Sequence, residues 1–130
     1  MLKRVKCQRF NVDILQPLLD LDEALPRLGG NSDVLMTLLA RFIDEFRANE
    51  IYLARKINLR EFDLARPLVH RLMHLSSNLA FSELTQEAWR CELCFKENKP
   101  HTALQAWTAM CMLVNLLEER YALAYEWPWP

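Results

Sequence analysis

The sequence has little glycine, no excess of either charge and no long apolar run. Only two of its 130 residues are glycine, and 16 basic residues against 17 acidic ones give a net charge of −1. No stretch approaches the ~18 apolar residues of a membrane-spanning helix, and the basic start MLKRVK leads into no apolar signal-peptide core. No basic stripe suited to a nucleic-acid backbone dominates the chain. We therefore expect a cytoplasmic protein that contacts neither membrane nor nucleic acid.

What the sequence does contain is the composition of a single globular domain, with 52% hydrophobic and 25% charged residues. Apolar residues recur at i, i+3 and i+4, and no segment alternates apolar and polar residues as a half-buried strand does. Gly29, Gly30 and Asn31 form a typical helix stop and start. Long helices with short connections predict an all-α antiparallel bundle. We expect helices over residues 18–28, 33–57, 63–79, 83–97 and 101–124.

Single residues indicate where some of these helices begin and end. Asp63 fits an N-cap, which would leave Pro67 in the first turn, where a missing N–H is not needed. Ser82 fits the N-cap of the following helix. Both prolines of the final YEWPWP resist a helical backbone, so residues 125–130 are expected to form a tail.

Four cysteines occur without the density or spacing of a disulfide framework: Cys7, Cys91, Cys94 and Cys111. The CELC stretch at 91–94 permits two interpretations. A zinc site needs four ligands, and only His101 and Cys111 lie near in the sequence, at no familiar spacing. Two cysteines three apart on a helix also serve as small apolar packing residues, which is the interpretation we favour.

The stretch LVHRLMHLSSNLA, residues 68–80, places two histidines one helical turn apart. Positions at 100° steps put an apolar face around Leu68, Leu72, Leu75 and Leu79, flanked by Ala65, Val69 and Ser76. His70 points almost opposite to that face. Arg66, His74 and Ser77 share its stripe, and Met73 lies at the edge. Both histidines are therefore expected to be exposed, and periodicity alone does not choose between them.

Four segments, in order and in register, carry a resemblance to a known family. They are DLDEALPRLGGN (20–31), VLMTLLARF (34–42), DLARPLVHRLMHLSSNLAF (63–81) and LTQEAWRCE (84–92). Over residues 18–122 the chain resembles the histidine-containing phosphotransfer (HPt) domain of bacterial phosphorelays. That resemblance implies an up-down-up-down four-helix bundle with a short N-terminal capping helix. It divides the chain into an N-terminal extension (1–17), the HPt-like bundle (18–124) and the C-terminal tail (125–130).

The resemblance also implies a function and a partner. His70, and not His74, takes the role of the phosphoacceptor. The expected partner is a response-regulator receiver domain with a phosphorylatable aspartate, and a hybrid sensor kinase is the second candidate partner. Both a free-standing protein and the last domain of such a kinase fit the resemblance. The receiver brings Mg²⁺, and no cofactor or metal is expected on this chain itself. Phosphoryl transfer of this kind depends mainly on alignment and charge stabilisation.

Two residues beside His70 depart from the family pattern. Met73 stands where the family has a lysine that can neutralise phosphate oxygens, and His74 stands where it has glycine. Arg66 and Arg71 can compensate for the missing charge, and a protonated His74 can donate to a phosphoryl oxygen. We expect Arg66, Arg71, Met73, His74 and Ser77 to contact the phosphoryl group or the receiver.

Three interpretations therefore stay open. The first is an HPt domain that passes phosphoryl groups through His70. The second is a degenerate HPt domain that binds a receiver or kinase and modulates signalling without efficient transfer. The third is a helical interaction domain whose CELC stretch and His101 bind a metal ion.

Overall fold

A computed structural model describes residues 10–126 of the chain. Its regular structure is entirely helical, and no strand occurs within that range. The prediction of an all-α fold is confirmed. The elements are η1 (Val12–Leu15), α2 (Leu21–Arg27), α3 (Ser32–Asn58), α4 (Phe62–Asn78), α5 (Ser82–Lys96) and α6 (Pro100–Glu126).

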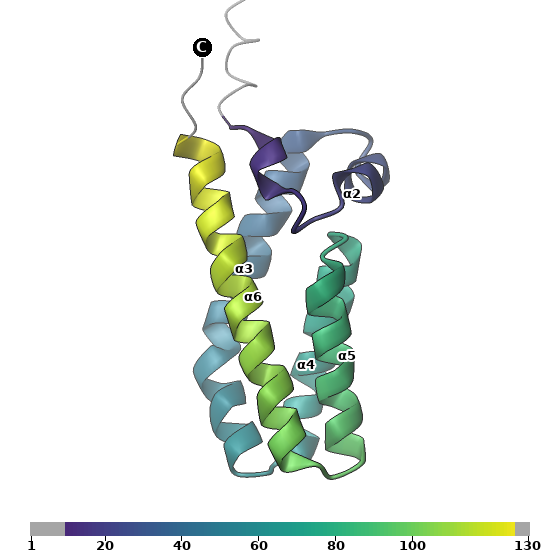
Figure 1. Ribbon diagram of the computed structural model, residues 1–130, viewed down its shortest axis with the longest axis vertical. Helices are drawn as coiled ribbons and strands as arrows, with labels where there is room; N and C mark the ends of the chain where they lie inside the picture. The colour runs from purple at the N-terminus through teal and green to yellow at the C-terminus, as the bar shows by residue number, and fades with distance from the viewer. Residues whose placement is uncertain (1–9, 127–130) are drawn as a thin grey trace, which may run out of the picture.

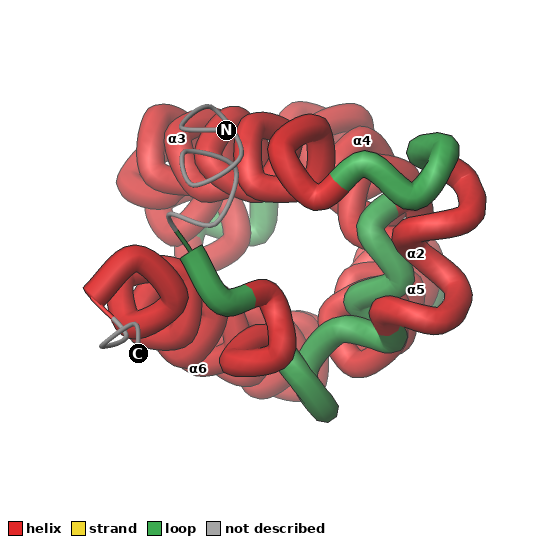
Figure 2. Tube along the Cα trace, turned by 90° about the horizontal axis from the view of Figure 1, so that it is seen from above, coloured by secondary structure: helices red, strands yellow, loops and turns green. Residues whose placement is uncertain are grey.

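The four long helices, α3 to α6, run side by side and enclose a common core (Figures 1 and 2). Helix α3 contacts α4 and α6, and α5 contacts the same two helices from the other side. Aromatic rings join neighbouring helices within the core. Phe46 of α3 stacks on Trp107 of α6 with ring centroids 5.4 Å apart, and Phe62 of α4 stacks on Phe95 of α5 at 4.9 Å.

The chain reverses direction at three short connections, residues 59–61, 79–81 and 97–99. Each contains one non-glycine residue in the left-handed region: Arg60 (φ 60°), Ala80 (φ 55°) and Asn98 (φ 55°). The following N–H donates to the carbonyl five positions earlier, with N···O distances of 2.8, 3.0 and 2.9 Å in chain order. This is the Schellman geometry that ends a helix and satisfies its last carbonyls.

The helix stop and start predicted before α3 is confirmed. Gly29 and Gly30 both have positive φ, 66° and 75°, which glycine adopts without steric cost. The side-chain oxygen of Asn31 accepts hydrogen bonds from the backbone N–H groups of Asp33 (3.0 Å) and Val34 (3.2 Å). A side-chain cap therefore fixes the first turn of α3.

Two other predicted helix starts are wrong by one or two residues. Helix α4 has Glu61 as its N-cap, without a side-chain cap, so Asp63 lies inside the first turn. Pro67 is then the sixth helical residue, beyond the turn whose N–H groups lack helical partners, and it leaves the Asp63 carbonyl without its usual donor. Ser82 is the first helical residue of α5 rather than its cap. In both cases the preceding Schellman turn, and not a polar side chain, sets the start.

The segment that precedes α2 packs against the C-terminal part of α6. The Asn11 N–H donates to the Ala124 carbonyl (2.9 Å), and the Arg120 guanidinium donates to the carbonyls of Ile14 (3.0 Å) and Gln16 (2.9 Å). Phe10 and Leu15 are buried in the shared core. Residues 10–17, which the sequence analysis assigned to an extension, thus contribute to the packed domain.

Helix α2 covers the C-terminal end of α4. Arg27 donates from Nη1 to the Ser77 carbonyl (2.8 Å), and the Asp20 N–H donates to the Ala80 carbonyl (3.1 Å). At the other end of the chain, α6 continues through Glu126, so the first two residues of the expected tail are helical. The two tail tryptophans at 127 and 129 lie outside the described residues.

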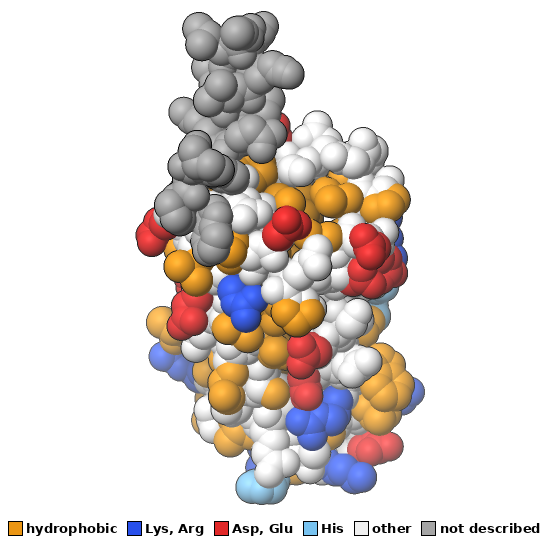
Figure 3. Space-filling view, turned by 45° about the horizontal axis from the view of Figure 1, so that its top comes forward, with side chains coloured by type: hydrophobic (Ala, Val, Ile, Leu, Met, Phe, Trp, Pro, Cys, Tyr) orange, Lys and Arg blue, Asp and Glu red, His pale blue; other side chains and the backbone are white. Residues whose placement is uncertain are grey.

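The outer surface carries both charges. Figure 3 shows acidic and basic side chains interspersed with apolar ones on the face that it displays, with no stripe of one sign. Within residues 10–126, none of the helices has the length and apolar composition required to cross a membrane.

Candidate functional site

Helix α4 presents one face to the core and the opposite face to solvent. The predicted centre of the buried face is partly wrong. Its fully buried residues are Ala65, Val69 and Ser76, together with Leu72 at 2% exposure, whereas Leu68 and Leu75 are only half-buried. Because α4 packs against both α3 and α5, the face is centred between the two helices rather than on the leucine row.

A buried serine on this face is satisfied by hydrogen bonds. Oγ of Ser76 lies 2.9 Å from the Met73 carbonyl and 2.8 Å from Oγ1 of Thr85 on α5, and its single hydrogen serves one of these two acceptors at a time. Thr85 in turn donates to the Phe81 carbonyl (3.1 Å). Hydrogen bonding removes most of the cost of burying the hydroxyl, so Ser76 joins α4 to α5 next to the histidines.

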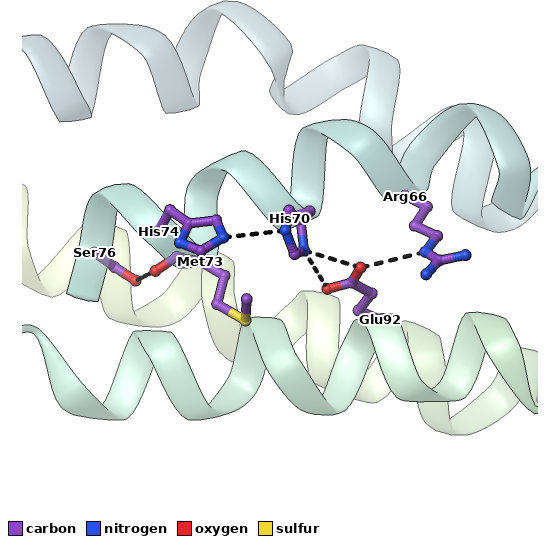
Figure 4. Close-up of polar contacts among 6 residues, drawn as sticks. All are labelled: Arg66, His70, Met73, His74, Ser76 and Glu92. Atoms are coloured by element: carbon purple, nitrogen blue, oxygen red, sulfur yellow. Dashed lines mark hydrogen bonds and ion pairs between the residues drawn. The ribbon is translucent and has the colours of Figure 1, made fainter. Parts of the chain in front are cut away.

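His70 lies on the exposed face of α4, and its side chain is 50% exposed. The predicted exposure is confirmed. Its Nδ1 faces the carboxylate of Glu92 on α5, 2.9 Å from Oε1 and 3.1 Å from Oε2 (Figure 4). A carboxylate only accepts hydrogen bonds, so Nδ1 carries the hydrogen and the neutral ring has its lone pair on Nε2.

His74 occupies the position next to that lone pair. Its Nε2 lies 3.0 Å from Nε2 of His70, and the two rings meet edge to face with centroids 4.6 Å apart. Since His70 accepts at Nε2, His74 is the donor. Glu92, His70 and His74 therefore form one hydrogen-bonded chain in which each group has a defined role (Figure 4).

Two further side chains frame a shallow hollow between α4 and α5. Arg66 lies on the far side of Glu92 from His74, with Nε 3.3 Å from Oε2. Met73 points from α4 toward α5 and is packed against the core (Figure 4). The hollow is completed by the exposed Trp89 and by Lys96, so cationic groups border the histidines at one end.

Arg71 and Ser77 lie apart from this group. Arg71 is directed to α3, where its guanidinium forms an ion pair with Glu45, and this pair raises the pKa of Arg71. Ser77 shares the stripe of His70 but lies two helical turns away, roughly 10 Å along the axis. It lines a separate hollow with Glu23 of α2 and Gln86 of α5. Of the predicted contact residues, Arg66, Met73 and His74 surround His70.

Glu92 is the site residue that sequence reasoning did not assign. Its side chain is only 14% exposed, and it holds both His70 and Arg66. The segment LTQEAWRCE ends on this residue, so the position was marked by the resemblance although its role was not. Its pairing with His70 depends on how α4 and α5 are aligned, which a one-dimensional pattern does not specify.

The cysteines of the CELC stretch point inward. Cys91 is fully buried and Cys94 is 5% exposed. Burial, and then the neighbouring Cys94, raises the pKa of Cys91 to about 12, and its thiol donates to the Ala103 carbonyl over 3.6 Å. His101 is exposed on α6, and its Nε2 lies 3.3 Å from Nε2 of Gln105. Within residues 10–126 no three His, Cys, Asp or Glu side chains gather as metal ligands, so a CELC–His101 metal site gains no support there.

Comparison of the chain with protein-family models, with curated proteins and with solved structures finds no match. The chemistry available at this site follows from its atoms. An exposed imidazole with a fixed tautomer presents one nucleophilic nitrogen, a carboxylate supports the opposite nitrogen, and a neighbouring N–H donor lies beside the nucleophile.

Proposed function

We propose that this chain is a phosphotransfer domain of a phosphorelay, accepting a phosphoryl group on Nε2 of His70 from a receiver-domain aspartate and passing it to a response regulator. The observation that carries the proposal is the contact between Nδ1 of His70 and the Glu92 carboxylate. It leaves Nε2 as the reactive atom of a half-exposed ring that another protein can approach.

The transfer needs no proton movement. The Nε2 lone pair attacks the phosphorus atom, the bond from phosphorus to the aspartyl oxygen breaks, and the aspartate leaves as a carboxylate. Nδ1 keeps its hydrogen throughout, and the ring gains positive charge as the new bond forms. Glu92 stabilises that charge through its hydrogen bond, as a carboxylate does for the imidazolium of a hydrolase triad.

His74 supplies a donor for the same step. Its Nε2–H points to the Nε2 lone pair of His70, 3.0 Å away. When phosphorus takes that lone pair, the N–H is within reach of a phosphoryl oxygen on the same side. A neutral His74 can therefore donate, without the protonation that the sequence analysis invoked. Arg66 and Lys96 place positive charge at the border of the hollow, which favours the approach of a dianionic group.

The fold is compatible with this function. Four long antiparallel helices with short connections correspond to the up-down-up-down bundle that we infer for the domain, with α2 as its capping helix. We further infer a receiver domain as the partner, alone or alongside a hybrid sensor kinase, with Mg²⁺ held by the receiver and a cytoplasmic location.

A second function is favoured by the same contact of His74. The hydrogen bond from His74 occupies the lone pair that transfer requires, and an imidazole at position 74 fills space in front of the acceptor. Met73 adds no charge. In this alternative, the domain binds a receiver or kinase and modulates its signalling without efficient transfer.

Phosphoryl labelling separates these functions. The chain is incubated with a phosphorylated receiver and Mg²⁺, and the acid-labile, base-stable label on the chain is measured. We expect His70→Gln to remove the label and His101→Gln, a matched change of an exposed histidine on α6, to leave it intact.

Each other outcome has a defined meaning. Label that survives His70→Gln but is lost in His74→Gln would show that His74, and not His70, is the acceptor. Receiver binding without label in the unaltered chain would support the second function. Absence of both, across a panel of receivers, would contradict both.

A further inference from the structure

We propose that His70 and His74 form a chelating site for a divalent transition-metal ion such as Zn²⁺, bound by the two Nε2 atoms and completed by water. The proposal concerns the same residues as the acceptor site but does not need them to be phosphorylated. Only its regulatory consequence, given below, rests on the proposed function.

The first observation is the distance between the two nitrogens. Nε2 of His70 and Nε2 of His74 lie 3.0 Å apart. Two nitrogens that ligate one zinc ion at its usual bond length of ~2.0–2.1 Å are separated by about 2.9 Å at a right angle and about 3.3 Å at a tetrahedral angle. The observed separation falls between these values, so the rings need only turn about their side-chain bonds to converge on one ion.

The second observation is the spacing on the helix. Histidines at i and i+4 on one helical face are the arrangement with which helical zinc motifs supply two of their ligands. Both positions here are exposed, so an ion reaches them from solvent without movement of the core. Within residues 10–126, no third His, Cys, Asp or Glu side chain joins the pair as a ligand. The two imidazoles are therefore the protein ligands of the proposed site, and water fills the remaining positions.

The third observation is the carboxylate behind His70. Metal-binding histidines usually donate their second ring N–H to a carboxylate or carbonyl, which fixes the tautomer and raises the basicity of the ligating nitrogen. Glu92 makes that contact with Nδ1 of His70 at 2.9 Å. His70 is therefore already in the tautomer that a metal ion requires. His74 reaches it by moving its hydrogen from Nε2 to Nδ1, which faces no described hydrogen-bond partner.

A bound ion and a phosphoryl group exclude each other, because both use the same lone pair of His70. If the domain transfers phosphoryl groups, zinc at this site blocks acceptance, and removal of zinc restores it. His74 then acts as the residue that makes the acceptor sensitive to the metal.

Zinc titration of the untagged chain, followed by calorimetry and by imidazole NMR resonances, tests the site. We expect one equivalent to bind and to shift the resonances of His70 and His74 but not of His101. His70→Gln and His74→Gln are each expected to weaken binding by more than tenfold, and Glu92→Gln by about tenfold to a hundredfold. His101→Gln serves as the matched control and should bind normally. Unchanged affinity in either His70→Gln or His74→Gln, or no binding by the unaltered chain, would overturn the site.

A labelling experiment tests the regulatory consequence separately. Label from one phosphorylated receiver is measured with and without zinc, on the unaltered chain and on His74→Gln. Zinc should reduce the label by a larger factor on the unaltered chain than on His74→Gln, each compared with its own label without zinc, since any effect of zinc on the receiver is common to both. Equal suppression of both would refute the regulation. Absence of label without zinc would refute the proposed phosphotransfer while leaving the zinc titration to decide the metal site.

Discussion

Two pairs of chemically versatile residues, one on α4 and one on α5, have nearly the same spacing, but one pair is exposed and the other is buried. His70 and His74 lie one turn apart on the exposed face of α4, whereas Cys91 and Cys94 lie one turn apart on the buried face of α5. The histidines are joined to each other and to Glu92, and the cysteines face the core. Spacing along a helix thus indicates a candidate site, and the exposure of the helix face determines whether its side chains are available for chemistry.

The largest expected difference between the pairs is in reactivity. Because burial raises the pKa of Cys91 to about 12, from 9.0 for an unperturbed thiol, its thiolate is about a thousandfold scarcer. At pH 8, iodoacetamide should modify Cys91 at least about a thousandfold more slowly in the folded chain than in urea. Peptide mass spectrometry measures this rate. Diethyl pyrocarbonate should modify His70 and His74 readily in the folded chain, and comparable Cys91 rates in the two states would contradict the comparison.

The second largest difference is expected in stability, between substitutions on the buried and on the exposed face of α4. Leu72 is 2% exposed, so Leu72→Ala should lower the free energy of unfolding by about 2–5 kcal/mol. His74→Gln, two residues further along and on the exposed face, should change it by less than about 0.5 kcal/mol. Urea denaturation gives both values. A large loss in His74→Gln would show that the histidine pair is structural rather than available for chemistry.

Glu92 should matter for rate more than for binding. Glu92→Gln keeps the shape but removes the charge, and loss of one charge-assisted hydrogen bond costs about 1.5–3 kcal/mol, or roughly tenfold to a hundredfold in transfer rate. Receiver affinity should change little. Nitrogen NMR of His70 should show a mixture of ring tautomers in the variant and Nδ1–H alone in the unaltered chain. An unchanged tautomer would show that the Glu92 carboxylate does not fix the ring of His70.

The buried thiol of Cys91 should also make the free energy of unfolding fall at alkaline pH. The pKa of Cys91 is higher in the folded chain than in the unfolded one, so the unfolded state loses its proton first. The stabilisation is complete below about pH 9 and is lost as the pH rises toward about 12. Between pH 9 and 10 the unaltered chain should lose about 1 kcal/mol more than Cys91→Ala. Parallel pH profiles would show that Cys91 does not titrate differently on folding.

The sequence predicts those features that depend on neighbouring residues. The cap at Asn31, the left-handed Gly29 and Gly30, and the exposure of His70 all follow from local patterns, and the structure confirms them. The starts of α4 and α5 are missed because left-handed Arg60 and Ala80 end the preceding helices without glycine.

Features that depend on contacts between helices are not predicted. The buried face of α4 is centred on Val69 and Ser76 rather than on the leucine row, because two neighbouring helices share it. Glu92 and Arg71 take their roles from partners 22 and 26 positions away in the chain, respectively. A single sequence gives the residues of such a pair without giving the pairing.

The atom that receives the phosphoryl group tests the central claim most directly. Phosphorus and nitrogen NMR of the chain after transfer from a phosphorylated receiver identifies the bonded nitrogen. The expected result is a phosphoryl group on Nε2 of His70, with Nδ1 still protonated against Glu92. A phosphoryl group on His74, or on Nδ1 of His70, would contradict the account.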